Sequence, residues 1–104
     1  MAYPSKYKDA QVEILGVPSV ARQLTAGSAS INTALTSTTQ RISMRAVGAD
    51  IRFSIGAGAQ TANGNTSNFI ANGERLDFAV PLGANIAVIR DGTVNGTLEL
   101  TELI

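Results

Sequence analysis

The sequence of 104 residues contains no cysteine, no histidine and no tryptophan. The missing cysteine excludes disulfides, thiolate metal sites and thiol redox chemistry. The missing histidine removes the commonest general base and the commonest metal ligand. Eight Lys/Arg balance eight Asp/Glu, so no excess of positive charge favours nucleic acid or an anionic membrane. Apolar runs are only a few residues long, and we therefore expect no membrane span.

The length of 104 residues indicates a single domain. A domain of this size buries roughly two thirds of its unfolded surface, so it can fold without a disulfide or a metal. The segment MAYPSKYKDA at residues 1–10 lacks the apolar core of a secretory signal, and Pro4 disfavours a helix within it. We therefore expect an extended N-terminal arm over residues 1–10 and a single folded domain over residues 11–104.

Short runs of alternating apolar and polar residues recur along the chain, which is the pattern of strands with one buried face. The residues expected to face inward are Val12, Ile14, Ile42, Met44, Ala46, Ile51, Phe53, Ile55, Leu76, Phe78, Val80, Ile86, Val88, Leu98 and Leu100. The polar residues expected to face water or a protein partner are Arg45, Arg52, Asp77, Glu99 and Thr101. Residues 23–40 carry no charge, and eight of these eighteen are Ser or Thr; they fit short strands near 20–25 and 28–35.

Turn-forming Asn-Gly and Asp-Gly pairs separate these runs, and no segment has convincing helical periodicity. One motif occurs twice: VGADIRF at 47–53 is echoed by LGANIAV at 82–88. We interpret the echo as shared turn chemistry in two hairpins, 41–55 and 75–90, with a true duplication as the alternative. Asp50 and Asn85 are expected to cap these turns through side-chain hydrogen bonds. The pattern predicts an all-β fold: a compact antiparallel β-sandwich, jelly-roll-like or a small barrel, with an extended N-terminal arm.

The segment IGAGAQTANGNTSN at residues 55–68 holds three glycines and three asparagines and carries no charge. A dinucleotide-binding loop needs G-x-G-x-x-G between a strand and a helix, but Thr61 stands at the third glycine position. A P-loop needs Gly-Lys-Ser/Thr, and no lysine follows Lys8. No helix is expected after the segment to direct amide groups at a phosphate. We therefore interpret it as a connection, either an exposed tip or a loop laid against a neighbouring subunit.

The segment YPSKYK at residues 3–8 places lysines beside tyrosines. Ser5 with Lys6 or Lys8 is the formal pair for serine catalysis, but a catalytic pair needs a rigid scaffold. Nucleic-acid sites also combine basic and aromatic residues, but on a larger scale. We expect no nucleic-acid binding; docking on another protein is one interpretation, and a terminus without function is the other. The candidate interface residues are Tyr3, Pro4, Lys6, Tyr7, Val12 and Ile14.

Two pairs of carboxylates lie close in sequence, Glu74 with Asp77 and Glu99 with Glu102. Glycoside hydrolysis uses such pairs, but it also needs a cleft and usually aromatic platforms, and we expect the three phenylalanines in the core. These carboxylates are expected on solvated faces and turns. The carbonyl groups of the Asn-rich loop and Asp91 leave a weak calcium site open. We assign no catalytic residue, no metal ligand and no cofactor, and expect that the protein is not an enzyme.

The chain has few features that protect the edges of a sandwich. Edge strands can pair with other chains, and the lysines that commonly discourage such pairing end at Lys8. Uncharged strands within residues 25–40 would suit a subunit interface. We therefore expect a homo-oligomer, with a trimer favoured.

Three segments carry a resemblance to a known group of proteins: RISMRAVGADIRFSIG, NFIANGERLDFAVPLGANIAVIRDG and GTLELTELI. They span roughly residues 41–104 and resemble small β-sandwich structural proteins of tailed bacteriophages. Residues 1–40 add nothing to this resemblance. The group has no chemical motif, so no functional residue can be transferred from it.

The resemblance implies a capsid decoration (cement) protein, made in the host cytoplasm and located on the virion. Its partner would be the major capsid protein or another virion protein. A head-fibre, neck or tail component is the alternative within the same class. A small ligand-binding or carbohydrate-binding β-sandwich is the alternative from another class, and exposed aromatic platforms would favour it.

Overall fold

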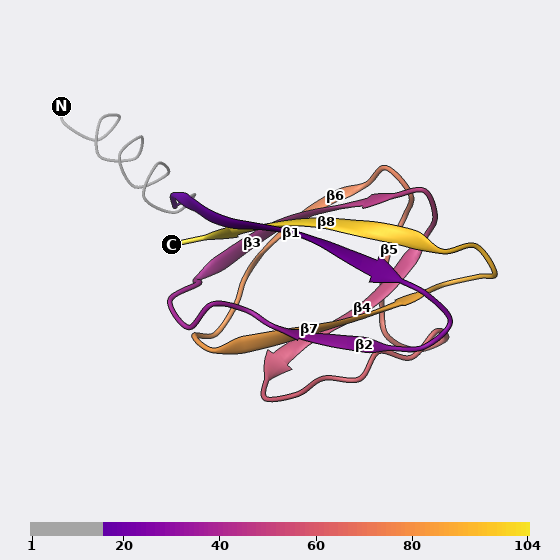
Figure 1. Ribbon diagram of the computed structural model, residues 1–104, viewed down its shortest axis with the longest axis horizontal. Coiled ribbons are helices and arrows are strands. Elements are labelled where there is room, and N and C mark those ends of the chain that lie inside the picture. Colours follow the sequence, from indigo (N-terminus) through magenta and orange to yellow (C-terminus); the bar gives the residue numbers. More distant parts are fainter. Residues whose placement is uncertain (1–15) are drawn as a thin grey trace, which may run out of the picture.

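The computed structural model describes residues 16–104, which form eight strands and no helix (Figure 1). The strands are β1 (Pro18–Ala26), β2 (Ile31–Ala34), β3 (Arg41–Val47), β4 (Ile51–Ala57), β5 (Asn68–Ile70), β6 (Arg75–Ala79), β7 (Ala84–Arg90) and β8 (Gly96–Leu103). The strands predicted near 20–25 and 28–35 correspond to β1 and β2. Within the described residues, no helix is long and apolar enough to cross a membrane.

The strands form two antiparallel four-stranded sheets. Sheet A has the order β1-β8-β3-β6, and sheet B has the order β2-β7-β4-β5. Six of the seven connections carry the chain from one sheet to the other, which is the double Greek-key arrangement of a jelly roll. The predicted antiparallel β-sandwich is confirmed, in its jelly-roll form.

The two predicted hairpins are wrong. Residues 41–55 contain β3 and β4, but β3 belongs to sheet A and β4 belongs to sheet B. The same separation holds for β6 and β7 within residues 75–90. A short glycine-containing turn can reverse a chain within one sheet or lead it into the facing sheet, and the alternating pattern looks the same in both cases. Among the described strands, β4 and β5 are the one consecutive pair that are neighbours in a sheet.

The echoed motif forms the same kind of corner twice. Gly48 has φ of 93° and Gly83 has φ of 73°, a conformation that residues with a Cβ rarely adopt. Asp50 does not cap its own turn: its Oδ1 accepts a hydrogen bond of 2.8 Å from the backbone N–H of Asn72. Likewise, Oδ1 of Asn85 accepts a hydrogen bond of 3.0 Å from the side-chain amide of Asn32 in β2. The expected turn caps therefore tie each corner to a neighbouring segment.

The core lies between the inner faces of the two sheets. Its most deeply buried large apolar residues, all less than 2% exposed, are Ile42, Met44, Ile51, Ile70, Ile86, Val88, Leu98 and Leu100. They come from both sheets, and all except Ile70 were predicted to face inward. Burial of each such side chain contributes roughly 1.5–3 kcal/mol, so this layer holds the two sheets face to face.

One end of the sandwich carries both ends of the described chain. Val17 donates a backbone hydrogen bond of 2.8 Å to Ile104 and accepts one of 2.9 Å from it. The corner between β6 and β7 lies at the same end (Figure 1). The predicted arm at residues 1–10 and the predicted strand residues Val12 and Ile14 lie outside the described residues.

Candidate interaction site at the open side of the sandwich

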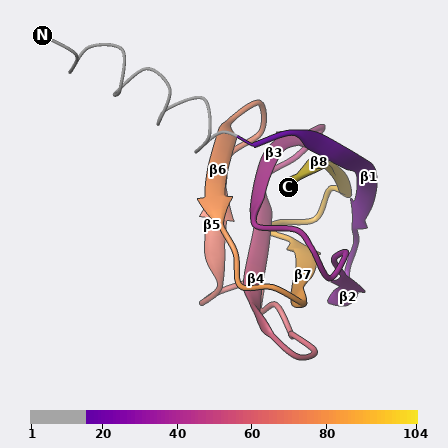
Figure 2. The same cartoon turned by 90° about the vertical axis from the view of Figure 1, so that its left-hand side faces the viewer.

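The sandwich has an open side between β5 and β6. Each is one of the two edge strands of its sheet, β5 in sheet B and β6 in sheet A, and they lie on the same side of the molecule (Figure 2). Between them is a groove of about 430 Å³. It is lined by Phe53, Ile55, Asn68, Phe69, Leu76, Phe78, Ala79 and Pro81.

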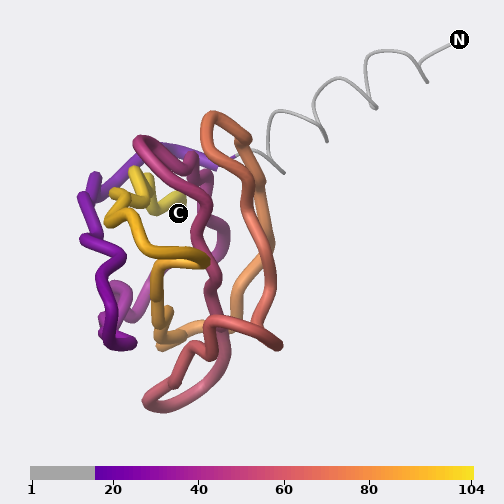
Figure 3. The backbone as a smooth tube through the Cα atoms, turned by 90° about the vertical axis from the view of Figure 1, so that its right-hand side faces the viewer, coloured from indigo at the N-terminus to yellow at the C-terminus, as the bar shows by residue number. Residues whose placement is uncertain are grey.

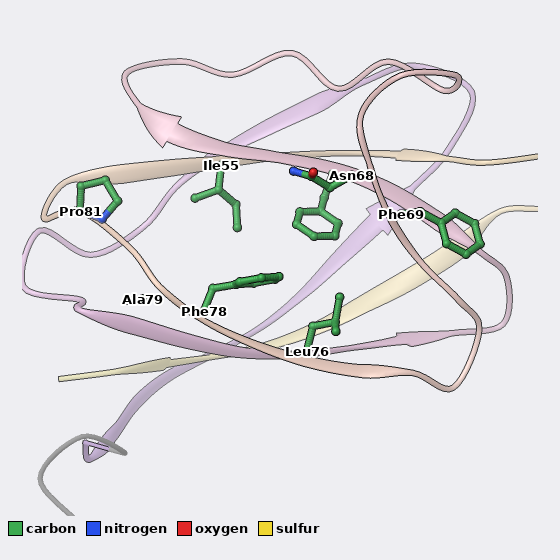
Figure 4. A pocket seen from close by; sticks show the side chains of 8 residues that line it. Ile55, Asn68, Phe69, Leu76, Phe78, Ala79 and Pro81 are labelled. Atoms are coloured by element: carbon green, nitrogen blue, oxygen red, sulfur yellow. The ribbon is translucent and has the colours of Figure 1, made fainter. Parts of the chain in front are cut away.

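Side chains from both sheets meet in this groove (Figure 4). Phe53 and Ile55 come from β4, Leu76 and Phe78 come from β6, and Pro81 follows in the next corner. The rings of Phe53 and Phe78 are tilted by 46° with their centroids 5.8 Å apart, a favourable aromatic contact. Phe53 is buried, whereas 38% of Phe78 is exposed. The expectation that all three phenylalanines belong to the core is therefore wrong for Phe78.

Phe69 is also more exposed than expected, at 42%. It pairs with Arg52 across β5 and β4, and the guanidinium carbon lies 4.8 Å from the ring centroid. Arg52 further donates hydrogen bonds to Asp91 (2.7 Å) and to the backbone oxygen of Ser67 (3.0 Å). Its cation–π contact and these bonds hold the start of β5 beside the connection after β7. Arg52 lies on the outer face of sheet B, as predicted, where it is half-buried against its own chain.

The groove is chemically simple. Asn68 carries the one polar side chain among its lining residues, and none of them is titratable. Such a lining has nothing to transfer a proton or to attack a substrate, but it can desolvate apolar side chains. Binding sites for polar ligands need several convergent polar groups, which this lining lacks. The groove is therefore suited to an apolar segment of a protein.

Further apolar side chains are exposed at the end where the described chain begins and finishes. Val17 is 64% exposed, Leu82 is 66% exposed and Ile104 is 47% exposed. Single exposed apolar residues are ordinary on a protein surface. These three lie at one end of the molecule, and Leu82 directly follows the groove residue Pro81, so it extends the apolar area available for contact with another chain.

The glycine- and asparagine-rich loop lies on the molecule's own surface. Residues 58–67 connect β4 to β5, and in Figures 1 and 3 this loop lies on the side of sheet B that faces away from sheet A. The backbone N–H of Ala62 donates a hydrogen bond of 2.8 Å to Ser30, and Ala62 is buried. The loop is therefore fastened to its own sheet through Ala62, while most of its other residues are exposed.

Gln60 fastens this loop to sheet B. Asn32, Ala87 and Ser54 form one row across β2, β7 and β4. Gln60 bridges the ends of the row: its backbone N–H donates to Asn32 at 2.9 Å, and its side-chain oxygen accepts from Ser54 at 2.8 Å. Ala87, in the middle of the row, is fully buried although it faces outward. The loop serves as a local cover of sheet B, and its backbone presents no phosphate cradle at a helix.

A buried carboxylate lies at the end of β8. Glu102 is 0% exposed and pairs with the guanidinium group of Arg22. Its Oε1 accepts hydrogen bonds from the backbone N–H of Thr36 (2.7 Å) and from the hydroxyl of Thr39 (2.6 Å). Burial alone would raise the pKa of Glu102, but these hydrogen bonds and the nearby Arg22 charge outweigh it and lower the pKa below its ordinary value. Glu102 therefore fastens the β2–β3 connection to sheet A.

Glu102 was expected on a solvated face, and its burial corrects that expectation. The signal was present in the alternation of β8, where Glu102 takes the inward position after Leu98 and Leu100. The neighbouring Glu99 is half-buried and accepts a hydrogen bond from Gln23 at 3.0 Å. With Glu102 fully enclosed by its partners, this pair has no access to a substrate.

The other predicted polar positions have local roles. Glu74 accepts a hydrogen bond of 2.9 Å from the backbone N–H of Ala71 and so closes the turn before β6. Asp77 is exposed on β6. Asp91 pairs with Arg52. Within residues 16–104, no group of three or more acidic side chains is arranged to hold a metal ion.

The predicted interface residues are not placed by the structure. All six lie outside the described residues: Tyr3, Pro4, Lys6, Tyr7, Val12 and Ile14. The groove beside β6 was missed at the sequence level because Phe78 follows the inward alternation and looks like an ordinary core residue. No protein-family model, no curated protein and no solved structure matches the chain.

Proposed function

We propose that the chain is a structural protein of a tailed-bacteriophage virion, and specifically a decoration protein that binds the assembled head. The observation that carries this proposal is the apolar groove beside the edge strand β6, a surface suited to protein–protein contact. The resemblance of residues 41–104 to small phage structural proteins supplies the class. The jelly-roll arrangement is compatible with it, since viral capsid proteins use this architecture, as do lectins.

The proposed mechanism is mechanical and involves no catalysis. A decoration protein binds many equivalent positions on the finished shell, with the major capsid protein or another virion protein as its partner. Because it binds the assembled shell better than the free subunits, it stabilises the shell by mass action. The protein would be made in the host cytoplasm and act on the virion as a homo-oligomer, with a trimer favoured.

The alternatives differ in what they require of the groove. A head-fibre, neck or tail component would use the same apolar contacts at fewer positions. A carbohydrate-binding module would require several polar groups around an aromatic platform. The exposed Phe78 is a candidate platform, but Asn68 is the one polar side chain of the lining. The groove therefore favours a protein partner over a sugar.

Quantitative mass spectrometry of purified virions tests the proposal. Hundreds of copies per particle, together with density for this chain on the head in images of the particle, would support a decoration protein. A few copies located at the neck or tail would support the alternative within the virion. Absence of the chain from purified particles would refute a virion role.

A further inference from the structure

The outer edge of β6 has free backbone hydrogen-bonding groups. Val80 donates a backbone hydrogen bond of 2.9 Å to Gln40, and alternate residues of an antiparallel strand bond the same neighbour. In the register of β6 with β3, the N–H and C=O groups of Arg75, Asp77 and Ala79 consequently point away from sheet A. No other described strand pairs with this edge. An extended segment could therefore add to β6 as a new strand.

A strand added at this edge would lie over the groove. Leu76 and Phe78 point inward from β6 and line the groove with Phe53 (Figure 4). Alternate side chains of the added strand would point the same way, about 7 Å apart. The position therefore fits a segment that has apolar residues at i and i+2 and that is not already packed in another hydrophobic core.

The segment QVEIL at residues 11–15 has this pattern, with Val12 and Ile14 separated by Glu13. It directly precedes Gly16, where the described chain begins. A Cβ built on Gly16 would lie 3.3 Å from the Cβ of Leu103, which places Gly16 beside β8. The chain therefore carries its own candidate strand at one end of the sandwich.

The short link to Gly16 makes the groove of the same copy hard for this segment to reach. β3 and β6 separate β8 from the free edge, so an added strand lies three strand spacings from β8, about 14 Å. Ile14 is two residues from Gly16 and can reach at most about 7 Å. Chain length therefore favours the groove of a different molecule as the place where Ile14 and Val12 enter together.

We propose that residues 11–15 of one copy add as a strand to the free edge of β6 in a second copy, burying Val12 and Ile14 against Phe78 and Leu76. The contact is head-to-tail, with different surfaces on the two copies, so it generates a closed ring or an open chain of subunits. It identifies a contact for the proposed homo-oligomer. Its test needs no capsid, so its failure would be distinguishable from failure of the virion role.

Cross-linking between single-cysteine variants tests the contact, because the natural chain has no cysteine to interfere. Purified Ile14→Cys protein and differently tagged Phe78→Cys protein are mixed and oxidised with copper phenanthroline. A disulfide-linked mixed dimer is expected, at least about tenfold above background, since facing residues of paired strands bring their Cβ atoms within about 5 Å. Leu76→Cys replaces Phe78→Cys in a second reaction, which covers the alternative register.

Glu13→Cys is the matched control, because residue 13 of a strand points to the opposite face from residues 12 and 14. Equal cross-linking of Glu13→Cys and Ile14→Cys with both acceptor positions would overturn the proposal. In the Ile14→Cys/Phe78→Cys double variant, a disulfide that forms within a single chain, and whose yield does not fall when the protein is diluted, would also overturn it.

Light scattering of the full-length protein gives an independent measurement. The Val12→Asp/Ile14→Asp variant should self-associate at least about tenfold more weakly, because each carboxylate would be desolvated in an apolar groove. Gln11→Asp is the control and should associate as the unmodified chain does. Unchanged far-ultraviolet circular dichroism would establish that both variants fold. A monomeric unmodified chain at high concentration, or unchanged association of the double variant, would overturn the proposal.

Discussion

Glu102 shows how a single polar residue can belong to the core. It continues the inward alternation of β8 after Leu100, but it faces the β2–β3 connection and not an apolar partner. Its carboxylate is paired with Arg22 and accepts hydrogen bonds from Thr36 and Thr39. Removing the carboxylate leaves the buried Thr39 and the partly exposed Arg22 without their partner, which costs more than the net value of the interaction.

Replacing Glu102 with Gln should therefore destabilise the protein at neutral pH by about 2–4 kcal/mol, somewhat less than the loss on breaking a fully buried ion pair, because Arg22 is partly exposed. The amide keeps an acceptor for the threonines, but it cannot neutralise Arg22. Urea unfolding followed by circular dichroism measures the change. Glu99→Gln is the control and should cost less than about 0.5 kcal/mol, because Glu99 is half-buried on the outer face. Equal losses for both variants would contradict this account.

The lowered pKa of Glu102 also predicts a pH dependence. Because the folded protein holds the pKa below the ordinary value of 4.5, the unfolded state binds the proton more readily. The stabilisation is fully present above pH 4.5 and is lost as the pH falls through the folded pKa. The unmodified protein should therefore lose stability on acidification more steeply than Glu102→Gln. Unfolding curves at a series of pH values between 7 and 3 test this, and parallel decline of both proteins would refute it.

At the scale of elements, the 58–67 loop is held by contacts with residues that are distant in the sequence. Gln60 spans from β2 to β4, and Gly56 leaves room for it: a Cβ at Gly56 would lie 2.7 Å from the Gln60 side-chain nitrogen. The loop and the outer face of sheet B therefore fit each other closely at Gly56. Nothing in the composition of the loop distinguishes this arrangement from a free surface connection.

Replacing Gln60 with Ala should loosen the loop on the β4 side, because the Ser54 hydrogen bond is lost while the backbone N–H of residue 60 keeps its bond to Asn32. The expected loss of stability is about 1–2 kcal/mol, from side-chain hydrogen bonds worth about 1 kcal/mol each. Amide hydrogen exchange should rise within residues 58–67 while the core strands keep their protection. Thr66→Ala, at an exposed position in the same loop, is the control and should change neither quantity. Unchanged exchange in the Gln60→Ala variant would show that other contacts hold the loop.

The strands were more predictable from sequence than their connections. Alternation placed Ile42, Met44 and Leu98 inward because burial of one face leaves a local pattern with a period of two. The corners at Gly48 and Gly83 were located but misassigned, because positive φ serves a hairpin and a sheet-to-sheet corner equally well. Pairing depends on residues far apart in sequence, and a single strand pattern contains no information about them.

The groove was unpredictable for a related reason. Phe78 has the inward position of a core residue, and its exposure results from the absence of any strand beyond β6. Phe69 is exposed because it shares the outer face of sheet B with its cross-strand partner Arg52. Both facts follow from the order of strands within the sheets, which the sequence pattern leaves open.

At the scale of the whole molecule, the topology predicts slow folding. β1 pairs with β8, so the first and last strands of the described chain must meet before sheet A is complete. Long loops must close before such contacts form, and all-β sandwiches accordingly fold in roughly milliseconds to seconds. Stopped-flow circular dichroism after dilution from urea measures the rate. Folding in microseconds would show that local contacts dominate, contrary to this expectation.

The hydrogen-bonded meeting of Val17 and Ile104 has a practical consequence. Both ends of the described chain leave from one end of the sandwich, whereas the exposed residues 92–94 lie between β7 and β8 at the opposite end (Figure 1). A guest peptide inserted there would project away from any support to which the chain ends are attached. The fold can therefore serve as a display scaffold, which is anchored through the chain ends and presents the inserted peptide at the opposite end.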